Sequence, residues 1–156
     1  MTRYDAEALF RDLCQQTGLQ EVRLYVDPFA LDHSWISVPA DRRIQAANFS
    51  DGTYAIRTTT EFLEPYSEDE VRGWFLHEMG HIALGHLDEL TGPARPSGVF
   101  NSITKHWEWE FAADAFAALY GGKDGLVSGL TKTPGHVSLT HPPVSVRVFK
   151  LAVMSC

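Results

Sequence analysis

The chain has 156 residues, of which 44% are hydrophobic, 12% aromatic and 21% charged, and its formal net charge at pH 7 is −7. This length suits one domain, so we expect residues 1–156 to fold around a single core. The composition excludes a disordered or fibrous chain. An acidic balance with no cluster of Lys and Arg argues against a nucleic-acid partner, because a phosphate-binding face needs concentrated positive charge.

No apolar run approaches the roughly 20 residues that cross a bilayer, and the N-terminal residues lack the apolar core of a signal peptide. We therefore expect no membrane association and a cytoplasmic location. Only two cysteines occur, Cys14 and Cys156. Such a low count does not indicate a disulfide framework.

The first third of the chain predicts one helix followed by strands. Apolar residues at helical spacing predict an amphipathic helix over Tyr4–Thr17. Alternating apolar and polar residues predict a strand over Glu21–Asp27. Residues 34–48 hold a weaker extended pattern, and a Ser50-Asp51-Gly52 turn leads into a further strand over Thr53–Thr60. Together these segments favour a small, mostly antiparallel sheet.

The next predicted element is a helix that begins with a capping box. Ser67 is a natural N-cap, and Glu70 three residues later completes the box. Glu68 and Asp69 suit the positive end of the helix dipole. Apolar residues then cover much of the surface of Val71–Leu87, which is typical of a buried central helix.

The last third predicts two further helices separated by glycine-rich chain. Residues 91–103 resemble a loop across the mouth of a site. Lys105–Tyr120 is rich in alanine and predicts a helix that ends at Gly121 and Gly122, and a stretch rich in Gly, Ser and Thr follows over Gly121–Thr140. Pro142 and Pro143 then precede a short final helix that ends near Met154.

The strongest functional signal is the pentapeptide His77-Glu-Met-Gly-His81 inside the central helix. At about 100° per residue, the two histidines lie about 40° apart, and Glu78 lies about 60° from His81. Two neutral imidazoles at this spacing can share one Zn²⁺ ion, and the glutamate can take a proton from a water bound to that ion. The motif predicts the core of a zinc hydrolase.

A catalytic zinc usually has three protein ligands, so a third is needed. His86 is one choice, but it follows Gly85 directly, whereas the metzincin signature separates its glycine and third histidine by two residues. If the helix continued, His86 would point about 140° away from His81. We therefore favour a histidine at the helix end, near the negative pole of the dipole, and keep ligation as the alternative.

The later helix offers the better choice. Glu110 and Asp114 are four residues apart and therefore share one face. One carboxylate can bind the metal while the other accepts the distal N–H of a ligand histidine. Four alanines, at positions 112, 113, 115 and 117, allow this helix to approach the first closely. Glu108 points the other way and fits a solvated surface.

These motifs resemble the gluzincin metallopeptidases of the HtpX and CAAX-prenyl-protease type. Residues 67–81 match the helix that carries His-Glu-x-x-His, and Glu110-Phe-Ala-Ala-Asp114 matches the Glu-x-x-x-Asp segment of that family. Residues 140–143, Thr-His-Pro-Pro, and the later Arg147 resemble its C-terminal motif. The resemblance implies an α+β, zincin-like fold, with a small sheet packed on an active-site helix and a second, ligand-bearing helix.

The resemblance also implies roles for single residues. Glu110 would be the third zinc ligand, Asp114 would support a ligand from behind, and Thr53–Thr60 would be an edge strand beside which a peptide could lie. The chain departs from the family because it lacks the transmembrane helices, which puts membrane-protein substrates in doubt. A softer similarity to the ImmA/IrrE-type proteases, which act on regulatory proteins, implies a regulatory protein partner.

The sequence therefore predicts a zinc-dependent metalloendopeptidase that acts on a protein or peptide substrate. His77, His81 and Glu110 would hold Zn²⁺, and Glu78 would be the general base. His141 is a candidate catalytic residue because it, or Arg147, could stabilise the oxyanion, although a structural histidine beside two prolines is an equal alternative. The remaining histidines, which we interpret as surface or structural residues, are His33, His106 and His136.

Two other functions remain open. The first is a regulatory or binding protein on the same scaffold with little or no proteolysis, against which the intact Glu78 argues. The second is a purely structural zinc site, but such sites usually contain cysteines, and none lies near His77 in the sequence.

Overall fold

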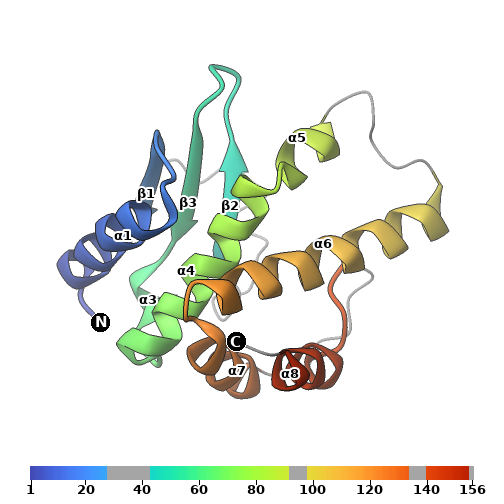
Figure 1. Ribbon diagram of the computed structural model, residues 1–156. Coiled ribbons are helices and arrows are strands. Elements are labelled where there is room, and N and C mark those ends of the chain that lie inside the picture. Colours follow the sequence, from blue (N-terminus) through green and yellow to red (C-terminus); the bar gives the residue numbers. More distant parts are fainter. Residues whose placement is uncertain (28–42, 92–97, 134–139, 155–156) are drawn as a thin grey trace.

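The computed structural model describes residues 1–27, 43–91, 98–133 and 140–154. The fold is α+β, with three short strands and a majority of helices (Figure 1). Helix α1 (Arg3–Thr17) lies where the periodicity predicts it and ends at Gly18, whose φ of 73° is left-handed. None of the helices in the described ranges combines the length and the apolar character that a membrane crossing needs.

The sheet is mixed, so the prediction of a mostly antiparallel sheet is wrong. Strands β1 (Val22–Val26), β2 (Ile44–Asn48) and β3 (Tyr54–Thr58) lie in the order β1-β3-β2. β3 pairs antiparallel with β2 and parallel with β1. The predicted extended pattern at residues 34–42 lies outside the described residues.

The expectation that Thr53–Thr60 forms an edge strand is also wrong. The β2–β3 hairpin leaves one side of β3 open, and β1 occupies that side, so β3 is central and β2 has the outer edge. The strand also stops early, because Thr59 caps the short helix α3 (Thr60–Leu63), accepting a hydrogen bond from the N–H of Phe62 at 3.1 Å. The predicted turn at residues 50–52 connects β2 to β3.

Helix α4 (Glu68–Ala83) begins with the predicted capping box. The Ser67 N–H donates to Glu70 Oε2 at 2.9 Å, and the Glu70 N–H donates to Ser67 Oγ at 3.3 Å. The helix ends four residues before the predicted Leu87, because Gly85 adopts a left-handed φ of 74° that turns the chain. Helix α5 (His86–Thr91) then starts in a new direction.

Helix α4 is the centre of the core. It packs against β2 and β3 on one side and against helix α6 (Val99–Leu119) and helix α7 (Lys123–Lys132) on others (Figure 1). Its apolar residues include several of the largest fully buried side chains, namely Val71, Phe75, Leu76 and Met79. The central, buried position predicted for this helix is therefore confirmed.

The last third is more helical than its glycines suggest. α6 starts six residues before the predicted Lys105, and α7 lies inside the stretch rich in Gly, Ser and Thr, where no helix was predicted. The glycines of α7 allow close packing, since a Cβ on Gly125 would lie 1.9 Å from the carbonyl oxygen of Asp69 on α4. Helix α8 (Val144–Val153) follows the two prolines as predicted. Residues 92–97, within the predicted mouth loop, lie outside the described residues.

Candidate metal centre

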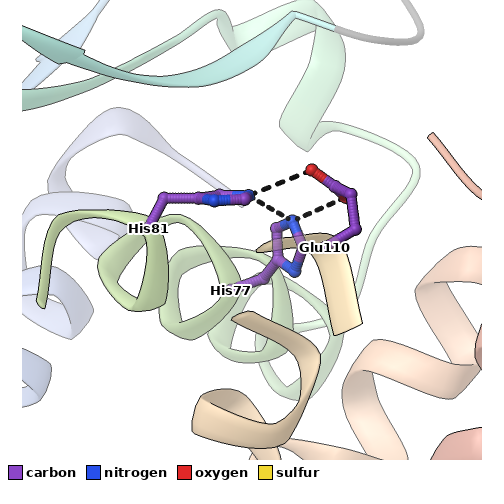
Figure 2. Close-up of side chains that lie close together, drawn as sticks. All are labelled: His77, His81 and Glu110. Carbon is purple, nitrogen blue, oxygen red and sulfur yellow. Dashed lines mark hydrogen bonds and ion pairs between the residues drawn. The ribbon is translucent and has the colours of Figure 1, made fainter. Parts of the chain in front are cut away.

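Two imidazoles from α4 and one carboxylate from α6 meet where these helices pack together (Figure 2). The two Nε2 atoms of His77 and His81 are 3.2 Å apart. His77 Nε2 lies 3.3 Å from Glu110 Oε2, and His81 Nε2 lies 3.1 Å from Glu110 Oε1. The helices approach this closely because Gly80 faces Ala113, whose Cα would lie 3.0 Å from a Cβ on the glycine.

The dimensions of this group suit zinc. Tetrahedral zinc with nitrogen and oxygen ligands at about 2.0–2.2 Å places its ligand atoms roughly 3.3 Å apart, close to the distances between these three side chains. Glu110 Oε2 is buried and accepts no hydrogen bond within the described part of the chain. A buried carboxylate oxygen that has ion-pair neighbours but no hydrogen bond is costly, and a bound cation would satisfy it. The residues present therefore fit a metal ion.

The charges of these side chains also favour a cation between them. Burial opposes protonation of His77, but the negative charge of Glu110 and the hydrogen bond to Asp114 raise the pKa of His77 to about 10. Burial alone would raise the pKa of Glu110, yet the two histidines hold it well below its usual value. With no metal, a proton on His77 supplies the positive charge that a metal would bring.

Asp114 lies behind His77, one turn along α6 from Glu110. The Nδ1 of His77 is 2.8 Å from Asp114 Oδ1, so an Nδ1–H donates to the carboxylate and Nε2 is left for a metal. Of the two acidic residues on this face, Glu110 therefore contacts both histidines and Asp114 orients one of them.

Arg147, on α8, is buried beneath the group. Its Nε and Nη2 donate to Asp114 at 2.9 and 2.7 Å, and its Nη1 lies 3.6 Å from Glu110 Oε2. The guanidinium of Arg147 therefore interacts with the carboxylates of both Asp114 and Glu110. These contacts favour a role in holding the ligands over the predicted role in stabilising an oxyanion.

Glu78 connects the group to the sheet. Its Oε2 accepts a 2.8 Å hydrogen bond from the backbone N–H of Ala46 on β2. Ala46 pairs with Ile56 on β3. Because its N–H donates to Glu78, this N–H points away from β3, toward the outer side of β2. The carboxylate adjacent to His77 in the sequence is therefore fixed beside the side of β2 that faces away from β3.

His86 is not where a continuous helix would place it. The turn at Gly85 brings its Nδ1 within 2.9 Å of the Nδ1 of His81, and its ring stacks on Trp109 with centroids 5.5 Å apart. His86 lies two residues beyond Leu84, the C-cap of α4, and is the first residue of α5, so the chain turns before it instead of continuing as one helix. Burial and the neighbouring His81 lower the pKa of His86 to about 4.

The remaining histidines occupy different surroundings. His141 is exposed at the rim of the group, with its Nε2 3.7 Å from Glu110 Oε1. The Nδ1–H of His106 donates to the carbonyl of Ser102 at 2.6 Å, which agrees with a structural role. His33 and His136 lie outside the described residues.

No protein-family model matches the chain, and no curated protein matches it either.

Proposed function

We propose that this protein is a zinc-dependent metallopeptidase with a zincin-like fold that hydrolyses peptide bonds in a protein or peptide substrate. The observation that carries the proposal is the convergence of His77 Nε2, His81 Nε2 and the Glu110 carboxylate, whose ligand atoms all lie within 4.8 Å of one another. Glu78, one residue from the first ligand, adds a base to the same helix. Closed structural zinc sites usually use cysteine, and this group contains none.

Different residues around the metal-binding group would serve different steps of the hydrolysis. When bound, zinc lowers the pKa of a coordinated water and polarises a carbonyl. Glu78 accepts the proton of the attacking water and returns it to the leaving amine. The hydrogen bond from Ala46 holds this carboxylate in place during both transfers. His141, at the rim, can donate to the oxygen on which negative charge develops.

The outer edge of β2 suits an extended peptide. In an antiparallel pair, every second residue directs its N–H and C=O away from the partner strand. Ile44 therefore directs its backbone groups to the same side as Ala46, the side on which Glu78 lies. Because the Ala46 N–H already donates to Glu78, a peptide beside this edge would pair with the Ala46 carbonyl and with the outward groups of Ile44, and it would pass the base. This position replaces Thr53–Thr60, which lies in the centre of the sheet.

The proposal is tested with a library of unstructured peptides, mixed with the zinc-loaded protein and followed by mass spectrometry. Wild type should cleave a subset of peptides, whereas Glu78→Gln should bind about one zinc per chain and cleave none. Glu108→Gln is the matched control, because Glu108 is an exposed acid on α6 and should leave cleavage unchanged. Zinc binding without cleavage by wild type would favour instead a regulatory or binding protein on the same scaffold.

A further inference from the structure

His86 is buried against the metal-binding group without belonging to it. Only 6% of its surface is exposed, and its nearest polar contact is the Nδ1 of His81, on the side of that ring away from Glu110. The two metal-facing histidines thus each have a partner behind them. Asp114 lies behind His77, and His86 lies behind His81.

The contact between two Nδ1 atoms requires one proton between them. A distance of 2.9 Å is a hydrogen bond, so one nitrogen donates and the other accepts. The Nε2 of His81 faces His77 and Glu110, and a metal ligand atom carries no proton. The neutral imidazole of His81 therefore carries its proton on Nδ1 and donates it, while His86 accepts on Nδ1 and keeps its own proton on Nε2.

Three features hold His86 in the orientation that this hydrogen bond needs. Its ring lies nearly parallel to Trp109, with an interplanar angle of 20°. The left-handed turn at Gly85 redirects the chain immediately before it. Two residues later, Asp88 accepts a hydrogen bond from the hydroxyl of Tyr54 at 2.7 Å, which ties α5 to β3.

We propose that His86 is a positioning residue that fixes the tautomer and the ring orientation of His81 for metal binding. This inference rests on the metal site of the proposed function, but it does not depend on proteolysis. A partner that orients a ligand histidine typically changes metal affinity by about 10- to 100-fold when it is removed.

Two substitutions separate hydrogen bonding from packing. His86→Phe keeps a ring against Trp109 but removes the acceptor. His86→Asn removes the ring but places an amide oxygen close to the former Nδ1. Zinc dissociation constants, measured by competition with a chromophoric chelator, should rise about 10- to 100-fold for His86→Phe and stay within roughly threefold of wild type for His86→Asn.

A second readout and a control make the result specific. In the Co²⁺-loaded protein, the visible absorption spectrum should change in His86→Phe and be restored in His86→Asn. His106→Phe is the control, because the ring of His106 also packs on Trp109, with ring centroids 5.0 Å apart, but does not contact His81. This substitution should leave zinc affinity unchanged. Thermal unfolding of the zinc-free variants verifies that each is folded.

The outcomes distinguish this inference from the proposed function. Wild-type affinity in His86→Phe, or an equal loss in His86→Asn and His86→Phe, would overturn the positioning role while leaving the zinc site intact. Failure of the wild type itself to bind zinc would reject the proposed function, and the role of His86 with it.

Discussion

The backbone N–H of Ala46 donates a 2.8 Å hydrogen bond to Glu78 Oε2, although the two residues are 32 positions apart in the chain. One is on the outer strand of the sheet and the other is on the central helix. The edge of the sheet and the proposed base are therefore aligned by one direct contact.

Removing this donor should impair catalysis more than folding. Ala46→Pro deletes the N–H, and because that group points away from β3, no bond of the β2–β3 ladder is lost. A hydrogen bond to a charged group contributes about 1.5–3 kcal/mol, so kcat for a cleaved peptide should fall roughly 10- to 100-fold. Zinc content should stay near one per chain.

Ile44→Pro is the matched control for this experiment. Ile44 is on the same strand with its N–H on the same side, where the proposed peptide would pair, but this N–H does not donate to Glu78. Ile44→Pro should therefore raise KM and leave kcat at saturating peptide unchanged. Equal losses of kcat in the two variants would show that proline perturbs the strand in general, and would contradict the role of the Ala46 contact.

Arg147 should act on metal affinity and stability. Arg147→Lys keeps a positive charge but cannot reproduce the paired hydrogen bonds to Asp114. We expect zinc affinity to fall about 10- to 100-fold and the free energy of unfolding of the zinc-free protein to fall by about 1–3 kcal/mol. Calorimetric zinc titration and urea unfolding measure these two quantities.

If Arg147 instead stabilised the oxyanion, Arg147→Lys would lower kcat at saturating zinc while zinc affinity and stability stayed at wild-type values. That combination would contradict the buried, ligand-holding role.

Packing of α7 on α4 should depend on Gly125. A Cβ at this position would lie 1.9 Å from Asp69 O, and backbone atoms on both helices would have to separate. Gly125→Ala should therefore lower the free energy of unfolding by about 3 kcal/mol or more, measured by urea denaturation. Gly52→Ala, in a turn with φ +83° and open space around it, should cost only about 1 kcal/mol. Similar costs for the two would refute the close helix contact.

Glu70 should make stability depend on pH. Burial opposes its ionisation, but hydrogen bonds from Lys132, Ser128 and the Ser67 backbone lower its pKa from 4.5 to about 2. A depressed folded-state pKa contributes stability above the unfolded value of about 4.5, and this contribution disappears as the pH falls toward 2. Glu70→Gln should therefore cost about 1–3 kcal/mol at pH 7.

The difference between wild type and Glu70→Gln should then shrink as the pH is lowered from 5 to 3. Urea unfolding in the presence of a chelator measures it without a contribution from metal loss. A difference that is constant from pH 7 to pH 3 would contradict the depressed pKa.

Local signals predicted the parts of the fold that depend on local sequence. The capping box at Ser67 and Glu70 and the periodicity of α1 are set by neighbours a few residues away. The place of β3 in the sheet was not predictable in this way, because it depends on which strand pairs with its second side. The same limit applies to α7, whose glycines lower helix propensity but are needed for contact with α4.

The candidate site was predicted better than the fold around it. Spacing placed His77 and His81 together, and it placed Glu110 and Asp114 on one face without deciding which carboxylate meets the histidines. The family resemblance pointed to Glu110, and this is the carboxylate that lies beside both histidines. The position of His86 was missed. Gly85 could have been read as the end of α4, because a glycine after the last periodic residue commonly adopts the left-handed conformation.

The central claim is that His77, His81 and Glu110 enclose zinc, and anomalous diffraction from crystals of the zinc-loaded protein tests it most directly. We predict one anomalous peak at the zinc edge, about 2.0–2.2 Å from both Nε2 atoms and from a Glu110 oxygen. A peak bound by other residues, or no peak between these three side chains at full zinc loading, would contradict the claim.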